Sequence, residues 1–593
     1  MRSIWSFAVA AAAALVVQAA LIASVRAQTP TAVLDNVTID AGFATYRIPR
    51  IEVFGGTMSA ADLRQLFDAS DPKPLPDRLR GLSADRIVAP EITAELKAAA
   101  PGQTVTYRNL VLSGVNAGRV SDASAQSVSM ALTDNNAGTI SGDFGALAAH
   151  NVDLVLAGRI TAGSRSDPNE AKGLLYESFS LESGGFVAQK ESVEITFGRI
   201  SGSNIKARAF SSPLSELPKD NSQPQVMTPE QKRKVAGFAA DLLDGFDIGN
   251  FEIRDLGVKG MADAKPFSAH LDRITLTDLG DAKIGEFSLA GFSTNTSDGI
   301  RVSFGNVAFR GFDMSATRAR LRTAATDIAQ PLDEAKPREL IPNLREFSLS
   351  GFEYAGKPAG GAIVAGAGRG GTNVRINKID TRSSDPYEGI PTALSASLDG
   401  LSFDVSPTSP DDGLRTIAGL GYSRVDIGSR MDVAWKQAAQ ELAFNEVSVN
   451  AAGMGTWKVK GLLTNVSKDL FAPEPAVVQA AALSALVKNV DVTVDDQGLL
   501  NRVIANEAKR SNRTPDAVRS EWVSAAAVAI PAALGDAPAG RTLGSAVSRF
   551  IAKPGTLHIS ASAPNGIGAA ELMLFSQDPA AFLKRMDVQA SVE

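Results

Sequence analysis

The chain contains only three histidines and no cysteine, so few of its side chains could bind zinc or act as covalent nucleophiles. Imidazole and thiolate groups are the usual protein ligands of zinc, and they also serve as catalytic bases and nucleophiles. His150, His270 and His558 are far apart in the sequence and form no HxH or HxxxH pair. We therefore interpret them as isolated surface or hydrogen-bonded residues, and the sequence predicts no metal site.

A glycine-rich segment from Gly366 to Gly371 matches the GxGxxG pattern of dinucleotide-binding loops. Such a loop requires a helix directly after it, because the helix N-terminus faces the pyrophosphate. Residues 372–379 instead alternate between polar and apolar side chains, which is typical of a strand. We interpret the segment as a hairpin loop and expect no nucleotide cofactor.

The acidic segment Asp491–Gly498 has oxygen-bearing side chains at alternate positions, as calcium loops do. Valines occupy the positions between them and the turn glycine falls in the wrong place, so a strand that runs into a turn explains the segment better. Asp411–Gly413 predicts a plain turn. No nucleophile elbow, Walker loop or Ser-x-x-Lys set is present, although folding could still assemble a site from distant residues. The sequence thus nominates no catalytic, cofactor-binding or metal-binding residue, and we expect a protein that is not an enzyme.

Short segments with apolar residues at every second position dominate the chain and predict half-buried strands. Clear examples are Ser192–Ile200, Val425–Lys436 and Thr456–Leu463. Clusters of Gly, Asn, Asp and Ser separate such segments at a spacing of roughly 8–12 residues, which favours hairpins and meanders. One side of each strand is apolar and the other polar, so we expect antiparallel sheets.

A short motif recurs along these strands. Glu286–Phe292 reads EFSLAGF and Glu346–Phe352 reads EFSLSGF, and looser copies occur at Glu177–Phe186, Asn306–Phe312 and Asn109–Val115. Each copy has two apolar residues on one face, followed by a glycine at which the strand can bulge or turn. The repetition predicts strands stacked along a long, curled sheet, although the irregular period does not define a strict solenoid.

Helices are fewer. Thr228, Pro229 and Gln231 form an N-cap, a proline at the first helical position and a capping box, and they predict a helix to about Leu243. Met58–Asp68 and Ala316–Ile328 are shorter candidates. The segment from Glu474 to Ile551 is mostly helical in pattern, and Pro531 is expected to kink or end the helix Thr514–Leu534. Further expected helices and a closing strand pair complete the list: Val477–Val487, Leu499–Lys509, Thr514–Leu534, the strands Thr556–Ala561 and Glu571–Phe575, and a final helix at Pro579–Lys584.

The first 27 residues have the layout of an export signal: a basic start at Arg2, an apolar stretch from Ile4 to Ala23, and small residues at Val25 and Ala27. We expect cleavage after Ala27 and a periplasmic mature chain. The alternative is an uncleaved membrane anchor, because about 20 residues could cross a hydrocarbon core of about 30 Å. Only in that case do we expect membrane contact.

The composition of the chain excludes some classes of binding partner. The chain carries a net charge of −6, which becomes −8 (57 basic and 65 acidic residues) without the first 27 residues. Both signs are interspersed and no basic block occurs, so we expect no nucleic-acid partner. The absence of cysteine means that an exported chain must be stabilised by its core rather than by disulfides.

These observations predict an α+β fold that is β-dominated: long antiparallel curled sheets of repeated amphipathic strands, with a mostly helical C-terminal part. The expected organisation is a signal peptide (1–27), an N-terminal β-rich region (28–225), a central β-rich region with a helical entry (226–415), a strand meander (416–472), and a helical C-terminal region with a closing strand pair (473–593). An outer-membrane barrel is excluded by the low aromatic content, 6%, and by the helical C-terminal quarter.

One further pattern resembles known proteins. The meander Gly421–Val449, the small-residue segment Gly453–Gly455, and the tail segments Phe550–His558 and Asp578-Pro579 resemble uncharacterised envelope proteins of Gram-negative bacteria, YdgA-like and more distantly AsmA-like. The resemblance is most specific over residues 345–593. It implies a periplasmic protein whose curled sheet holds or passes lipid.

Three functions from different classes follow as hypotheses. The first is a non-enzymatic periplasmic envelope protein that binds lipid or another apolar ligand along a β-sheet groove. The second is an envelope scaffolding module whose partners are other envelope proteins. The third, with the least support, is a hydrolase of an envelope polymer, which would need convergent carboxylates or a serine-based dyad.

Overall fold

The computed structural model describes residues 29–40, 44–68, 70–96, 103–134, 138–162, 165, 167, 169–190, 192–211, 228–262, 265–297, 299–327, 341–356, 373–384, 386–534, 537–568, 571 and 583–593. The expected export signal and the Gly366–Gly371 loop lie outside these residues, as do most of the expected strand Glu571–Phe575 and residues 579–582 of the expected last helix. No helix in the described part of the chain is both long enough and apolar enough to cross a membrane.

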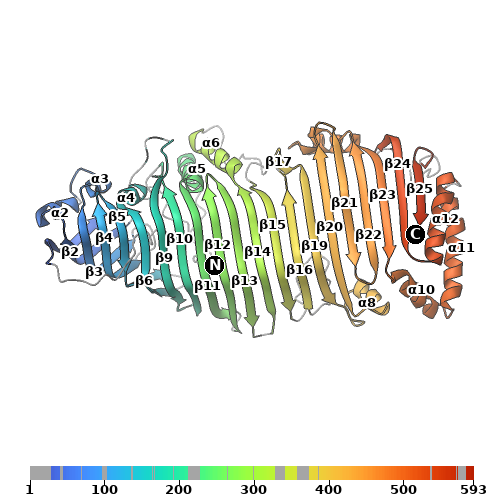
Figure 1. The fold of residues 1–593 in the computed structure, drawn as a ribbon, viewed down its shortest axis with the longest axis horizontal. Coiled ribbons are helices and arrows are strands. Elements are labelled where there is room, and N and C mark those ends of the chain that lie inside the picture. The colour runs from blue at the N-terminus through green and yellow to red at the C-terminus, as the bar shows by residue number, and fades with distance from the viewer. Residues whose placement is uncertain are drawn as a thin grey trace. The chain divides into compact units, whose positions relative to one another are not determined.

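The fold is β-dominated and antiparallel, as the sequence predicted, and it divides into two compact units. Unit 1 comprises Met1–Ser297 and Phe309–Asn343, and unit 2 comprises Asp298–Ala308 and Leu344–Glu593. Strand β14 (Arg301–Asp313) contributes residues to both. Figure 1 shows each unit as a succession of antiparallel strands with helices beside them.

Unit 1 is built on a sheet whose strands pair in the order β1–β2–β3–β4 and then β9–β10–β11–β12–β13. Its strands are β1 (Ala32–Asp40), β2 (Ala44–Phe54), β3 (Ala84–Leu96), β4 (Thr104–Asn116), β5 (Arg119–Ala125), β6 (Ser127–Asp134), β7 (Gly138–Phe144), β8 (Leu147–Asp153), β9 (Gly173–Ala188), β10 (Val193–Ala207), β11 (Phe246–Ala262), β12 (Lys265–Gly280) and β13 (Lys283–Thr296). Its helices are α2 (Ala60–Leu66), α3 (Leu75–Leu79), α4 (Leu154–Ala162), α5 (Pro229–Asp244) and α6 (Ser315–Thr326).

The sheet of unit 1 forks between β4 and β9. The second half of β4 pairs with β5, which pairs with β8, while its first half pairs with β6, which pairs with β7. Both branches rejoin on β9, because β8 pairs with Ser178–Leu181 and β7 with Gly184–Ala188. Two long strands are thus bridged by two pairs of short ones.

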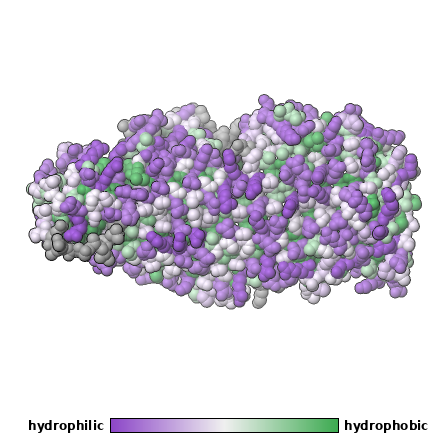
Figure 2. All heavy atoms as spheres, viewed as in Figure 1, coloured by the Kyte–Doolittle hydropathy of each residue, from purple (hydrophilic) through white to green (hydrophobic). Residues whose placement is uncertain are grey.

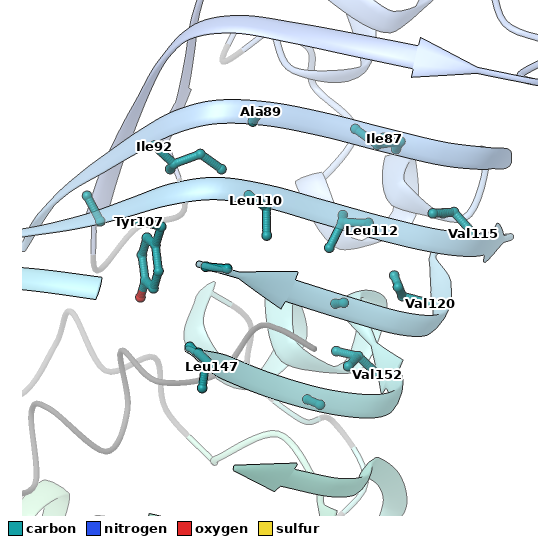
Figure 3. Packing of buried hydrophobic residues seen from close by; sticks show 14 of the residues in the cluster. Ile87, Ala89, Ile92, Tyr107, Leu110, Leu112, Val115, Val120, Leu147 and Val152 are labelled. Carbon is teal, nitrogen blue, oxygen red and sulfur yellow. The ribbon is translucent and has the colours of Figure 1, made fainter. Parts of the chain in front are cut away.

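The main hydrophobic core lies inside this forked region. It contains buried side chains from β1 through β10, among them Leu34, Leu147 and Leu181, which are at most 1% exposed. Figure 3 shows the side chains of β3, β4, β5 and β8 gathered on one shared inner face. Two tyrosines, Tyr107 and Tyr176, also lie in this core, and burial raises the pKa of each hydroxyl above its ordinary value. The apolar sides of these strands are therefore explained by burial in a closed core.

Unit 2 contains a sheet in which nine strands pair in chain order: β15, β16, β19, β20, β21, β22, β23, β24 and β25. Their bounds are β15 (Asn343–Ala355), β16 (Asn373–Ser383), β19 (Ala393–Asp404), β20 (Arg424–Lys436), β21 (Glu441–Ala451), β22 (Gly455–Thr464), β23 (Leu486–Asp496), β24 (Thr556–Gly568) and β25 (Asp587–Val592). The remaining elements are the hairpin β17 (Pro386–Tyr387) and β18 (Ile390–Pro391), the helices α8 (Asp412–Gly419), α9 (Pro475–Ser484), α10 (Leu499–Arg510), α11 (Pro515–Ala533) and α12 (Pro538–Ala552), and the 3₁₀ helix η3 (Lys468–Phe471).

Most of the expected helices are present. Helix α5 begins with the predicted capping box, in which the Gln231 N–H donates to Thr228 Oγ1 at 3.2 Å and the Thr228 N–H donates back to Gln231 Oε1 at 2.9 Å. Pro531 lies inside α11, two residues before the helix ends. The mostly helical C-terminal part is interrupted by β23, and the closing strand β24 pairs with β23 on one side and with β25 on the other. The expected pairing of Thr556–Ala561 with Glu571–Phe575 is therefore wrong, because both edges of β24 are already occupied.

One local prediction is wrong. Asp411–Gly413 does not form a plain turn but starts α8, and the Leu414 N–H donates to the Asp411 side chain at 3.0 Å. An aspartate at this position accepts a bond from an N–H of the first helical turn that has no partner within the helix. The buried Leu414 then holds the helix on the sheet.

Four glycines of the recurring motif have a left-handed backbone conformation: φ is +69° at Gly291 and +65° at Gly351, and Gly114 and Gly311 share this region. The register of β12 with β13 is the same on both sides of Gly291, from Leu271–Phe292 to Arg273–Ala290, so no extra residue is inserted there. The expected bulge or turn is therefore not found at Gly291. Glycine is needed for another reason, because a Cβ atom on Gly291 would lie 1.8 Å from Asp272 Oδ2.

Replacing Gly291 by alanine is expected to destabilise unit 1 by about 2–3 kcal/mol, because the left-handed backbone conformation and the overlap with Asp272 both oppose a side chain. Gly453 is the matched control: it has the same φ of +69° but no atom within 4 Å of the added Cβ, so alanine there should cost only about 1 kcal/mol. Urea unfolding followed by far-UV circular dichroism measures both, and equal losses would show that the overlap is relieved without cost.

Candidate ligand-binding face

The sheet of unit 2 presents one side made almost entirely of apolar side chains. Because directly paired residues of antiparallel strands project to the same side, the register defines rows that run across all nine strands. The first row is Leu349, Ile379, Leu398, Ser429, Val449, Trp457, Val494, Leu557 and Val592. The second row is Phe347, Thr381, Ala396, Met431, Val447, Val459, Val492, Ile559 and Ala590. We call these two rows the apolar face.

The apolar face contains no charged residue, and its only polar side chains are Ser429 and Thr381. Eight inter-strand gaps of about 4.8 Å give the rows a length of about 38 Å. This continuity follows from the sequence, because the two-residue period of every strand places its valines, leucines and isoleucines on the same side once the strands are in register.

The middle of the apolar face is open. Val449 is 41% exposed, Val459 39% and Val447 37%, although all three are large apolar side chains on central strands. A valine in a closed core would be almost fully buried. No second layer therefore covers these positions in the described part of unit 2.

Both ends of the strands, in contrast, are closed by small clusters. At one end α8 and Met454 pack against Phe403 and Val425. At the other end, Phe471 of η3 and Val466 pack against Trp435, whose indole N–H donates to the Val466 carbonyl oxygen at 2.9 Å. The open part is thus bounded along the strand direction and extends across the strands.

The opposite side of the same sheet is charged. Lys458 Nζ lies 2.7 Å from Glu446 Oε2, and Arg382 Nε lies 3.3 Å from Glu346 Oε1, each across neighbouring strands. Hydrogen bonds from Lys458 and Ser448 lower the pKa of Glu446. In the view of Figure 2 hydrophilic residues predominate and hydrophobic ones form scattered patches. A continuous apolar row is therefore not typical of the visible surface of this protein.

Unit 1 carries a comparable row that begins in its closed core. Leu181, Ile200, Ile253, Ile274 and Leu289 are paired in succession from β9 to β13. Of these, only Leu181 belongs to the fully buried set, and the others are partly exposed. Each unit by itself thus has a sheet with one apolar side.

The most strongly buried charges lie elsewhere in unit 1, where α5 and α6 meet the sheet. Asp241 is 0% exposed, and its Oδ1 lies 2.7 Å from both Arg165 Nη2 and Arg322 Nη2, while the Ser211 N–H donates to its Oδ2 at 2.7 Å. Asp244 in turn pairs with Arg208 at 3.0 Å. Arg165, Arg208, Arg322 and Ser211 all contact these two carboxylates, so we interpret the cluster as a structural anchor of the helix pair.

The histidines and acidic segments that the sequence analysis singled out are not brought together. His150 lies on β8 and His270 on β12 of unit 1, while His558 lies on β24 of unit 2. Asp491 and Asp495 lie on β23, as expected, and Asp495 accepts from the Thr556 hydroxyl at 3.0 Å. Among the described residues, no group of three or more His, Asp or Glu is placed to hold a metal ion.

The Gly366–Gly371 loop lies outside the described residues, but its flanking elements are clear. β15 and β16 pair antiparallel, with Ala355 opposite Asn373, and the segment that follows the loop is the strand β16. The strand after the loop is confirmed, and a helix that could face a pyrophosphate does not begin there.

Sequence reasoning did not name the residues of the apolar face as a site. The signal was present as alternation, but alternation alone does not say whether an apolar side is buried under a second layer. Exposure in three dimensions supplies that distinction.

Comparisons with known proteins give one match. A family model described as an uncharacterized protein matches residues 448–593, about a quarter of the chain. No curated protein and no solved structure showed significant similarity. The matched part includes β22–β25 and α9–α12, and thus the C-terminal half of the apolar face.

Proposed function

We propose that this is an exported protein of the bacterial periplasm that binds the acyl chains of lipids along the apolar face. The observation that carries the proposal is the open centre of that face, with Val447, Val449 and Val459 each more than a third exposed in a row without charge. The export signal expected at residues 1–27 and the resemblance to envelope proteins support the location.

Physical considerations favour a lipid over a small polar ligand. Apolar surface gains about 25 cal/mol for each Å² removed from water, and a flexible chain can lie along a row of valines without hydrogen bonds. Exposed apolar patches of several hundred Å² on soluble proteins commonly mark binding sites for membranes, ligands or proteins. A row of about 38 Å exceeds the hydrocarbon thickness of one leaflet, about 15 Å, so a single acyl chain would fill only part of it.

A matched pair of substitutions on β21 tests the proposal. Val449→Asp adds one negative charge to the apolar face, whereas Asn450→Asp adds the same charge one residue later on the opposite side. After purification of the full chain, lipid extraction and mass spectrometry should find bound lipid in the wild type and in Asn450→Asp. Val449→Asp should retain at least about tenfold less, which corresponds to about 1.4 kcal/mol.

Two results would contradict the proposal. One is a purified wild-type protein without lipid that also takes up none from phospholipid vesicles. The other is equal lipid content in Val449→Asp and Asn450→Asp. Circular dichroism of both variants shows whether any loss reflects unfolding instead.

A further inference from the structure

Three adjacent strands of unit 1 place an aspartate, a histidine and a serine side by side. In the register of β5 with β8, Asp122 is opposite His150, and in the register of β8 with β9, His150 is opposite Ser178. Directly paired residues project to the same side of the sheet, with Cβ atoms about 4.5–5.5 Å apart. The chain neighbours Ala123 and Ala149 are buried, so this row lies on the outer side.

The histidine is oriented by its contact with the carboxylate. His150 Nδ1 lies 2.7 Å from Asp122 Oδ1. When Nδ1–H donates to the carboxylate, the lone pair of the neutral imidazole is on Nε2, on the side of the ring away from Nδ1. Neither Nε2 nor the Ser178 hydroxyl has a hydrogen-bond partner among the described residues. The register places this hydroxyl beside the ring on the neighbouring strand, and catalysis requires the two side chains to approach each other.

The other two histidines lack this arrangement and serve as internal comparisons. His270 is also opposite a serine, Ser293, but its contact with Asp272 is through Nε2 at 3.1 Å. His558 is opposite Ser591, and its Nδ1 faces the hydroxyl of Thr493 at 3.3 Å rather than a carboxylate. Only at His150, among these three, does a carboxylate hold Nδ1 while a serine lies on the other flanking strand.

We propose that Asp122, His150 and Ser178 form a serine esterase site that acts on short carboxylic esters. The side chains of Asp122 and His150 are 38% and 44% exposed, so a substrate reaches them from solvent. The row lies on the polar side of the sheet, away from the buried core, which favours a short acyl group such as acetyl over a long chain. The site is independent of the apolar face.

The chemistry balances with water as the only co-reactant. The Ser178 oxygen forms a bond to the ester carbonyl carbon while His150 Nε2 takes the hydroxyl proton. The bond from that carbon to the alcohol oxygen breaks, and His150 returns the proton to the departing alkoxide. Water then attacks the acyl-serine by the same route and releases the carboxylic acid. Asp122 is a positioning residue, because it acts through the imidazole.

A fluorophosphonate probe on the full-length protein tests the site, because it records activation of a serine without requiring turnover. The expected result is a covalent adduct on Ser178 located by peptide mass spectrometry, with labelling lost in Ser178→Ala and at least tenfold slower in His150→Gln. Ser203→Ala and Ser293→Ala should label like the wild type, since Ser203 is opposite Ser178 without a histidine beside it. In Asp122→Asn the pH profile of labelling should shift, which a merely structural role would not produce.

No adduct at Ser178, or an adduct that forms equally fast in His150→Gln, would overturn the proposal. Circular dichroism and an unchanged unfolding midpoint establish that each variant is folded. Labelling of the Val449→Asp variant should equal that of the wild type, so the outcome for this site is separate from the outcome for lipid binding.

Discussion

Replacing Asp241 by alanine is expected to lower the free energy of unfolding of unit 1 by about 3–5 kcal/mol. The Arg165 side chain is 4% exposed and would remain buried without its carboxylate, and Arg322 would lose the same partner. Breaking a buried ion pair from one side leaves an uncompensated charge in a medium of low polarity, which explains the size of the effect. The loss should appear first where α5 and α6 meet the sheet.

Urea unfolding followed by circular dichroism measures this loss, and hydrogen exchange of the α5 amides locates it, because a chain with two units need not unfold in one step. Glu95→Gln is the control. It removes one partner of the exposed pair Arg47–Glu95, whose side chains are 61% and 45% exposed, so a loss of no more than about 1 kcal/mol is expected. If the two variants lose the same stability, the buried cluster does not anchor the helices.

The same variant has a defined pH dependence. Burial alone raises the pKa of Asp241, but hydrogen bonds from Ser211 and from Arg322 outweigh it, so the pKa lies below its ordinary value. A carboxyl with a lowered pKa in the folded state stabilises the protein above its unfolded pKa of about 3.9, and this stabilisation is lost as the pH falls through the folded pKa. The stability difference between wild type and Asp241→Ala should therefore be constant from about pH 5 to 8 and narrow below about pH 4.

Replacing Trp435 by alanine is expected to destabilise unit 2 by about 3–5 kcal/mol. The indole is 7% exposed, its ring centroid lies 4.4 Å from that of Phe471 and 5.6 Å from that of Tyr387, and it holds the Val466 carbonyl. Alanine would leave a cavity and would remove the hydrogen bond to a buried acceptor. The cluster that closes this end of the strands would then lose its central side chain.

Trp457→Ala is the control, since Trp457 is only partly buried, against the cluster at the other end of the strands. We expect it to lose less than half as much stability as Trp435→Ala, and Trp435→Phe should fall between the two because it keeps a ring in the cluster. Urea midpoints by far-UV circular dichroism compare the three variants. A Trp457→Ala loss as large as that of Trp435→Ala would mean that a partly buried side chain stabilises unit 2 as much as the buried Trp435 does.

The alternation of side chains predicted where strands form, and it also predicted the antiparallel arrangement. Val425–Lys436 became β20 and Thr456–Leu463 became β22, with shifts of one residue at most of their ends. The motif glycines were only partly informative. Those of four copies have a left-handed backbone, but those of the copy Glu177–Phe186 do not. Local chemistry was thus sufficient for the strands and not for the glycines.

Features that depend on strand register, or on residues far apart in the sequence, could not be predicted from the sequence. Arg165 and Asp241 are separated by 76 residues, and neither carries a local sign that it is buried. The rows of the apolar face required the pairing of nine strands, including several bulges that shift the register by one residue. The Asp411 cap could have been found, because an aspartate three residues before a buried leucine is a common helix start. Gly413, two residues later, favoured the interpretation as a turn.

The pairing of the strands of unit 2 in chain order has a consequence for how that unit acquires its structure. Each new strand from β19 to β25 finds its partner in the strand that precedes it in the same sheet, so most contacts close short loops. Chains dominated by such local contacts fold quickly, and units that contact only their neighbours can add one at a time. Unit 2 can therefore assemble progressively from its first strands as the polypeptide emerges, with a growing strand edge as its template and without waiting for its C-terminus.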